Sequence, residues 1–207
     1  MNSFNVRIGK CKWLLRHSAS VLFGFVLVAR CAGEPVIILD PVFYRTPITE
    51  PIAGSKHTVI AYYSENSDGS VTPLQAANLV NKSLTETQTA ALAHARTLFQ
   101  QLDVKLVRND HDVVVAIRLE STDPALSSIL LLPELRTAFT QFLGKEYLAC
   151  APTRFVIFLF PRIGENLEQF ATDIESFYHN STWPISTELF TWSGDQLAVE
   201  QDFERND

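Results

Sequence analysis

The densest group of ionisable side chains in the sequence is Asp110-His111-Asp112. An imidazole beside two carboxylates can act as a general base or hold a metal ion. Adjacent residues of a strand point to opposite faces, however, so these three side chains need not converge. Asn109 and Asp110 also favour a turn, where polar side chains are ordinarily solvated. The three residues are therefore the first candidates for catalysis, and a polar turn is the simpler interpretation.

Cys150 is the second residue whose type could do chemistry, because a thiol near a histidine can act as a nucleophile. Four histidines could supply the partner: His57, His94, His111 and His179. The neighbours of Cys150 are apolar, and they match no catalytic signature. We therefore expect Cys150 to be a small buried hydrophobic residue.

Sequence motifs that carry a known chemistry are missing from the chain. It has no Gly-x-Ser-x-Gly nucleophile elbow, no Walker A loop, no dinucleotide fingerprint, no HExxH and no CxxC pair. Residues 66–70 resemble the start of a calcium loop, but the glutamate that would complete the loop is absent. The sequence thus predicts no metal and no cofactor, and it favours a non-catalytic protein over an enzyme with scattered catalytic residues.

Aromatic side chains are the remaining candidates for a binding site. Five of them, Tyr62, Tyr63, Trp183, Phe190 and Trp192, could line a groove for a carbohydrate or a peptide, although most large aromatic residues belong to a core. Trp183 is the better candidate because Pro184 follows it and the pair lies beyond a predicted helix end. Both tryptophans are weak candidates for ligand contacts.

Strands predominate at both ends of the predicted fold, and helices lie between them. Helices are expected to begin at Thr72 and at Thr85, where a cap precedes a glutamine, and the second continues to Leu102. A further helical stretch should begin at Asp123, bend at Pro133 and stop at Gly144, and residues 165–178 form an amphipathic helix. The expected strands are residues 36–39, 57–63, 104–107, 113–119, 155–160, 187–192 and 196–203.

The strand at 155–160 is apolar without alternation, so we expect it to be central and covered on both faces. The order of elements lacks the strict alternation of a doubly wound sheet. The predicted fold class is α+β: a single domain with a mixed β-sheet and helices packed on it.

The first 33 residues have the three parts of a secretory signal. Basic side chains come first, an apolar run follows at 21–29, and Cys31-Ala32-Gly33 provides small residues for cleavage. We expect residues 1–33 to be a signal peptide or membrane leader, 34–56 an extended proline-rich segment, 57–203 the globular domain and 204–207 a polar tail. The location is then extracytoplasmic, either periplasmic or secreted.

Several alternatives for this leader remain open. The apolar run is shorter than the roughly 20 residues that span a bilayer, yet the segment could still anchor the chain in the membrane. Lipidation of Cys31 is a second alternative, although Arg30 stands where a lipobox has a small residue. A mitochondrial transit peptide and a buried N-terminal helix are the others.

The charge of the chain is divided unevenly between leader and body. The chain has 17 basic and 23 acidic residues, and five of the basic residues but none of the acidic ones precede Glu34. The body therefore has 12 basic and 23 acidic residues and a net charge of −11, which repels phosphate backbones and anionic membrane surfaces.

The partners that remain are a protein or a small ligand, with membrane contact only through an uncleaved leader. From the leader, the acidic body and the missing catalytic motifs, the sequence predicts an exported accessory or binding protein. The alternative is an extracytoplasmic hydrolase that uses Asp110, His111 and Asp112.

Overall fold

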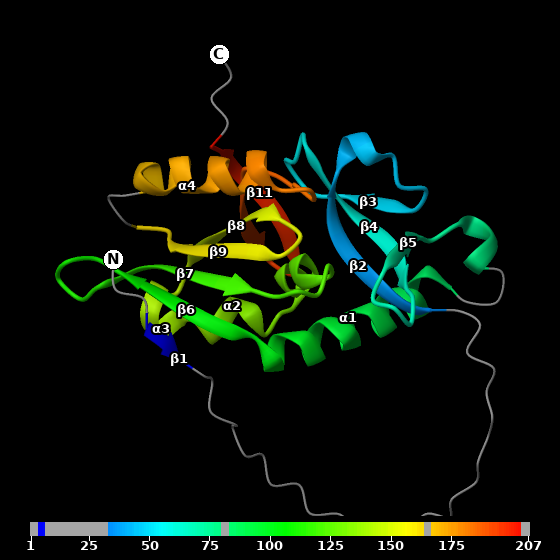
Figure 1. Cartoon of the computed structure of the whole chain (residues 1–207), viewed down its shortest axis with the longest axis horizontal. Helices are drawn as coiled ribbons and strands as arrows, with labels where there is room; N and C mark the ends of the chain where they lie inside the picture. The colour runs from blue at the N-terminus through cyan, green and yellow to red at the C-terminus, as the bar shows by residue number, and fades with distance from the viewer. Residues whose placement is uncertain (1–3, 7–32, 80–82, 164–166, 204–207) are drawn as a thin grey trace, which may run out of the picture.

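The computed structural model describes residues 4–6, 33–79, 83–163 and 167–203. Its larger sheet has seven strands in the order β1-β6-β7-β9-β8-β10-β11, and every neighbouring pair is antiparallel (Figure 1). The strands of this sheet are β1 (Phe4–Val6), β6 (Asp103–Arg108), β7 (Val114–Glu120), β9 (Val156–Pro161), β8 (Tyr147–Thr153), β10 (Glu188–Ser193) and β11 (Gln196–Asp202).

A smaller antiparallel sheet lies beside the larger one, on the right in Figure 1. Its central strand β4 pairs with the other three, and its members are β2 (Glu34–Pro41), β3 (Thr49–Pro51), β4 (Thr58–Glu65) and β5 (Val71–Pro73). Strand β2 is buried over most of its length, because α1 and a 3-10 helix cover the side away from β4. The proline-rich stretch at 34–56 contains β2 and β3, and the strand expected at 36–39 lies within β2.

Helices cover both faces of the larger sheet (Figure 1). Helix α4 (Leu167–Asn180) packs on one face, where Phe158 and Phe160 of β9 meet Phe170 and Ile174. The other face holds the main core, in which Ile157 and Leu159 of the same strand contact further helices. Those helices are α1 (Leu84–Gln101), the 3-10 helix η3 (Leu126–Leu131), α2 (Leu135–Ala138) and α3 (Thr140–Leu143).

These observations confirm the α+β class and the burial of residues 155–160 on both faces. They also confirm the hairpin of β6 and β7 and the hairpin of β10 and β11. The expected mixed sheet is wrong, because the described strands form two antiparallel sheets.

The helix expected to begin at Thr72 is also wrong. Residues 71–73 form β5, because they pair with the end of β4, and a short 3-10 helix η2 (Ala76–Leu79) follows. The cap and proline signals at this point were local, whereas the pairing with β4 is a tertiary interaction. The stretch from Asp123 to Gly144 is helical as expected, but it consists of η3, α2 and α3.

Most of the predicted leader, including the apolar run at 21–29, lies outside the described residues. Residues 4–6 form β1 and pair with the free edge of β6. Among the parts of the chain that the structure describes, no helix combines the length and the apolar character that a membrane span requires.

Candidate functional site

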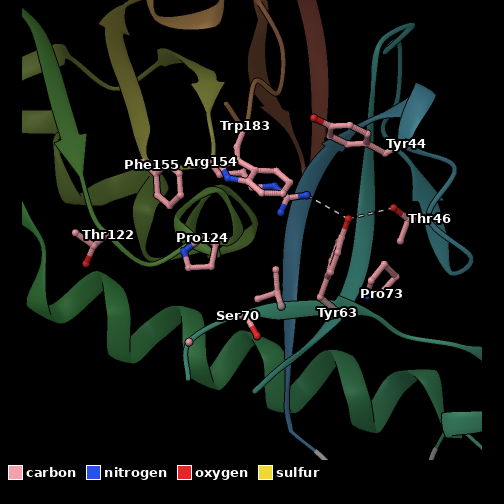
Figure 2. A pocket seen from close by; sticks show the side chains of 12 residues that line it. Tyr44, Thr46, Tyr63, Ser70, Pro73, Thr122, Pro124, Arg154, Phe155 and Trp183 are labelled. Atoms are coloured by element: carbon pink, nitrogen blue, oxygen red, sulfur yellow. Dashed lines mark hydrogen bonds between the residues drawn. The ribbon is translucent and has the colours of Figure 1, made fainter. Parts of the chain in front are cut away.

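A cavity of about 590 Å³ opens between the two sheets, close to the turn that joins β8 to β9 (Figure 2). Its volume falls within the usual range for small-molecule sites. Aromatic rings, prolines and hydroxyl groups form most of its wall. The lining residues are Tyr44, Thr46, Tyr63, Gly69, Ser70, Val71, Pro73, Thr122, Pro124, Arg154, Phe155 and Trp183. We call this cavity the ring-lined pocket.

The wall of the ring-lined pocket contains one charged side chain, Arg154, which is paired in the interior. Arg154 stands in the turn after β8, and its Nη2 atom lies 2.7 Å from Oδ1 of Asp40 on β2. The exposed fractions of the two side chains are 5% and 0%. Because a lone buried charge is strongly unfavourable, each residue depends on the other. The pair also ties the larger sheet to the smaller one.

The hydroxyl of Tyr63 and that of Thr46 complete the surroundings of Asp40. Tyr63 donates a short hydrogen bond to Oδ2 of Asp40, and Thr46 Oγ1 donates to the same oxygen at 3.1 Å. Arg154 Nη2 in turn donates to the Tyr63 hydroxyl at 3.2 Å. Burial and the hydrogen bond to Asp40 raise the pKa of Tyr63, so that its phenol stays neutral. The cluster therefore carries no net charge.

Three aromatic rings surround the Arg154 guanidinium. Its central carbon lies 4.8 Å from the ring centre of Trp183, 5.2 Å from that of Tyr63 and 6.0 Å from that of Tyr44. All three are cation–π contacts, and Figure 2 shows the guanidinium lying between Trp183 and Tyr63. A backbone hydrogen bond from Arg154 N to Trp183 O at 3.1 Å fixes the two residues to each other. The rings of Tyr44 and Trp183 also reach solvent, with exposed fractions of 39% and 44%.

A histidine stands between the two loops that border this pocket. His94 of α1 has its Nε2 atom 3.0 Å from Oδ2 of Asp123 and its Nδ1 atom 3.8 Å from Oε2 of Glu65. The hydrogen bond to Asp123 and the charges of Asp123, Glu65 and Glu34 raise the pKa of His94 against the effect of its burial. Residues next to Asp123 line the pocket, and Glu65 precedes the turn at 66–70 that lines it from the other side. His94 thus connects the two loops through its contacts with Asp123 and Glu65.

The pKa of Asp123 is lowered, although burial by itself would raise it. The hydrogen bonds from His94 and from the amide of Ala125, together with the charge of His94, outweigh that burial. His94 and Asp123 therefore form an ion pair between the lowered pKa of Asp123 and the raised pKa of His94.

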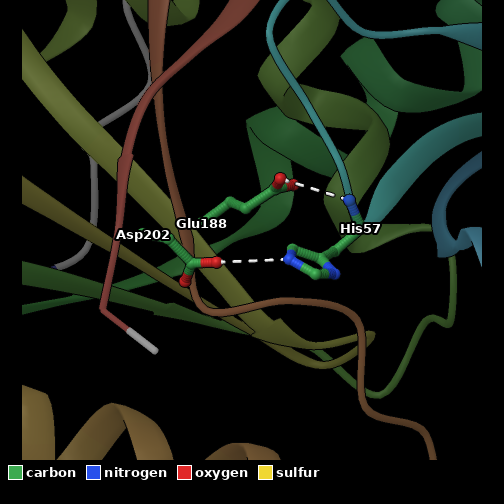
Figure 3. A group of neighbouring side chains, drawn as sticks. All are labelled: His57, Glu188 and Asp202. Atoms are coloured by element: carbon green, nitrogen blue, oxygen red, sulfur yellow. Dashed lines mark hydrogen bonds and ion pairs between the residues drawn. The ribbon is translucent and has the colours of Figure 1, made fainter. Parts of the chain in front are cut away.

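A second group, His57, Glu188 and Asp202, has the composition of a metal site (Figure 3). Nε2 of His57 lies 3.6 Å from Oδ2 of Asp202. The carboxylate of Glu188, however, already accepts hydrogen bonds from Ser55, Lys56, His57, Thr58 and Ser186. These five donors occupy the lone pairs of both oxygens. Glu188 is therefore an anchor for the loop before β4, and we assign no metal to this group.

The three residues first considered for catalysis lie in the turn between β6 and β7. Asp110, His111 and Asp112 are exposed, and Asp112 has a left-handed backbone with φ of 60°. Asn109 accepts hydrogen bonds from the amides of His111 and Val113, which is the pattern of a polar turn. None of the described cavities has these residues in its wall. Their geometry gives no support to the hydrolase alternative.

The two tryptophans considered for binding have different positions. Trp183 stands at the mouth of the ring-lined pocket. Trp192 is partly buried, donates a hydrogen bond from Nε1 to the Leu130 carbonyl at 2.8 Å and packs edge-on against Tyr147. It borders a second cavity, of about 580 Å³, on the side of α1 and β11. The structure therefore brings Trp183, but not Trp192, to the candidate site.

Sequence reasoning missed Asp40 and Arg154, although a signal for them exists. Asp40 directly follows four apolar residues, and Arg154 directly precedes the apolar run 155–160 that contains most of β9. Single charges of opposite sign next to two buried strands indicate an interior ion pair. Cys150, in contrast, is fully buried as expected, and burial raises the pKa of its thiol well above the usual value.

Comparison of the chain with protein-family models, with curated proteins and with solved structures finds no match. No relative therefore assigns a role to any residue of the ring-lined pocket. The geometry of Arg154, Asp40 and the three rings is what identifies this pocket as the candidate site.

Proposed function

We propose that the chain is an exported, non-catalytic binding protein and that its ligand occupies the ring-lined pocket. The observation that carries this proposal is the pair of half-exposed rings, Tyr44 and Trp183, at the mouth of a cavity with a neutralised interior. Mostly apolar concave sites with a few fixed polar groups are typical of small-molecule recognition.

The composition of the wall supports binding over catalysis. The residues that line the pocket include no histidine, cysteine, lysine, aspartate or glutamate. Its serine, Ser70, donates a hydrogen bond to Asp68 and accepts one from Asn66, both within its own turn. A nucleophile paired with a base, which hydrolytic enzymes need, is not present among these lining residues.

The basic leader and the acidic body support export, as argued from the sequence. An anionic protein with a removable cationic start is consistent with work outside the cytoplasm. A buried cysteine as the single thiol of the chain after Gly33 also suits an oxidising compartment, because it offers no exposed group for disulfide exchange.

Native mass spectrometry tests the binding part of the proposal. The wild-type chain, Trp183→Ala and Ile163→Ala are purified from the extracytoplasmic fraction of the host and compared. Ile163 is a suitable control because it is apolar, strongly exposed and absent from the pocket wall. We expect a small-molecule adduct on the wild type and on Ile163→Ala that is lost from Trp183→Ala. An adduct of equal occupancy on all three proteins would place the ligand elsewhere.

The masses of the same preparations test export. A mature chain that lacks the residues before Glu34, found outside the cytoplasm, is the expected result. Export is contradicted if the chain is found only as soluble cytoplasmic protein that retains Met1. In that case the ligand adduct alone decides whether the binding proposal holds.

A further inference from the structure

The chemistry of the ring-lined pocket narrows the class of ligand it can take. We infer that the ligand is a neutral saccharide, held with its oxygen-bearing edge toward the hydroxyls of Ser70 and Thr122 and its apolar face against the rim. This inference rests on the proposed binding function of the pocket. Charge, shape and hydrogen-bonding capacity each contribute one step.

The first step is charge. Arg154 and Asp40 neutralise each other at 2.7 Å, and both are almost completely buried. Tyr63 remains an uncharged phenol because its pKa is raised by burial and by its hydrogen bond to Asp40. A charged ligand would lose its hydration without gaining an opposite charge, which is strongly unfavourable. The pocket therefore selects a neutral ligand.

The second step is shape. Trp183, Tyr63 and Tyr44 all lie around the guanidinium of Arg154, so the space between these rings is already filled. The structure consequently offers no empty slot between two aromatic planes, which a flat nucleobase would use. The other apolar side chains of the wall are Val71, Pro73, Pro124 and Phe155. Such a wall suits a puckered ring with an apolar face.

The third step is hydrogen bonding. The hydroxyls of Ser70 and Thr122 stand at the exposed border of the pocket. Arg154 can only donate hydrogen bonds, and it is almost completely buried, so the hydrogen bonds to a ligand fall to these hydroxyls. Several acceptor and donor oxygens spread around the edge of a ring would match these groups. A neutral sugar has both this edge and the apolar C–H face required by the rim.

Fluorine NMR of the full chain labelled with 5-fluorotryptophan provides the test. The chain has three tryptophans, Trp13, Trp183 and Trp192, and the signal of Trp183 is assigned with Trp183→Phe. The probes are glucose, N-acetylglucosamine and their disaccharides, each raised to its solubility limit. We expect a saturable shift of the Trp183 signal with at least one of these sugars, and no shift of the Trp192 signal, which also reports that the fold is intact.

Charged analogues and one variant make the test specific. Glucuronic acid and glucosamine should bind at least about tenfold more weakly than glucose, because the site cannot balance their charge. Tyr44→Ala should weaken the binding of the best sugar by about tenfold, whereas Ile163→Ala should leave it unchanged.

Three outcomes overturn the inference in different ways. If adenosine or uridine shifts the Trp183 signal and no sugar does, the pocket binds ligands but the saccharide is the wrong class. If neither sugars nor nucleosides shift it while the native adduct also persists in Trp183→Ala, the binding function proposed for this pocket fails as well. Equal affinity for glucose, glucuronic acid and glucosamine would refute the argument from charge.

Discussion

Arg154 and Glu188 are each almost fully buried, and each is held by groups from a distant part of the chain. Arg154 has Asp40 and three rings, whereas Glu188 has five hydrogen-bond donors. In both cases the charge is compensated at close range, which is the condition under which a buried ion is tolerated. His94 differs from them because it is partly exposed and its pKa is raised by its hydrogen bond to Asp123.

The cluster around His94 predicts a dependence of stability on pH. The pKa of His94 in the folded state is raised above its usual 6.5, so protonated His94 stabilises the fold fully below that value. The contribution is lost as the pH rises through the raised pKa. The pKa of Asp123 is lowered from its usual 3.8, so its contribution is present above that value and is lost as the pH falls through the lowered pKa. The pair therefore contributes most between these limits.

Urea unfolding at a series of pH values measures this effect. We expect the free energy of unfolding of the wild type to fall by about 1 kcal/mol between mildly acidic and mildly alkaline pH, the scale of one hydrogen bond to a charged group. His94→Gln should lose most of this slope, because Asp123, Glu65 and Glu34 then face an uncharged side chain. His111→Gln, in the exposed turn, should keep the wild-type slope. Identical slopes in both variants would exclude His94 as the cause.

Single residues of the site were only partly predictable. Trp183 could be chosen because a proline and a predicted helix end mark an exposed loop, whereas Trp192 carries no local signal of its burial. The partners of Arg154 are 114 positions away for Asp40 and 91 for Tyr63, and no local pattern connects such residues. A cluster assembled from distant strands becomes visible only when the pairing of the sheets is known.

At the scale of elements, helix α1 shows how a start signal can be displaced. The sequence suggests a cap at Thr85, but the structure has Ser83 as the N-cap with a complete capping box. Ser83 Oγ accepts a hydrogen bond from the Glu86 amide at 3.1 Å, and the Glu86 carboxylate accepts one from the Ser83 amide at 2.8 Å. A cap at Ser83 uses Glu86 to complete the capping box, whereas a cap at Thr85 would use Gln88. The hydrogen bonds of the structure, and not the sequence pattern, identify Ser83 as the cap.

Alanine substitutions distinguish the two caps. Ser83→Ala should lower the free energy of unfolding by about 1 kcal/mol, because the Glu86 amide loses its acceptor. Thr85→Ala, at the exposed second position of the helix, should change it by much less. The measurement is urea unfolding monitored by circular dichroism. A larger loss in Thr85→Ala than in Ser83→Ala would mean that α1 begins later than the structure shows.

Strand β8 marks the limit of pattern-based prediction for elements. All seven of its residues are buried, and Pro152 lies within it. Neither the alternation of a half-exposed strand nor a length typical of a helix is present, so the sequence left this stretch unassigned. Its position between β9 and β10 is what turns it into a strand.

At the scale of the whole molecule, a few polar interactions join the two sheets. Asp40 and Arg154 form one link, and Glu188 of β10 forms another by holding the loop that precedes β4. The backbone of Ala53 and that of Val199 add a third at 2.8 Å. The sequence could indicate an α+β class from the order of elements, but not that the strands divide into two sheets, because each of these links joins residues more than 100 positions apart.

Glu188→Gln tests the hydrogen bonds through which Glu188 of β10 holds the loop before β4. An amide cannot accept hydrogen bonds at both of its polar atoms, so the donors Ser55 and Thr58 or the nearby amides lose a partner. We expect a loss of about 2–4 kcal/mol in the free energy of unfolding, measured by urea titration. Glu146→Gln, on the surface and in an exposed ion pair with Arg162, should change it by less than about 0.5 kcal/mol. Equal effects would show that Glu188 does not hold the two sheets together.

Gly33 fits so closely against the end of β4 that a side chain there would collide with the carbonyl oxygen of Glu65. The next residue, Glu34, already pairs with Glu65 in the ladder of β2 and β4. A peptidase needs a loose, extended stretch of chain, and a paired strand does not provide one. If the residues before Glu34 are removed, as we propose, cleavage at this bond has to precede the pairing of β2 with β4. A copy in which β2 pairs first would then keep its N-terminal segment, so the relative rates of cleavage and folding would set the fraction of processed chains.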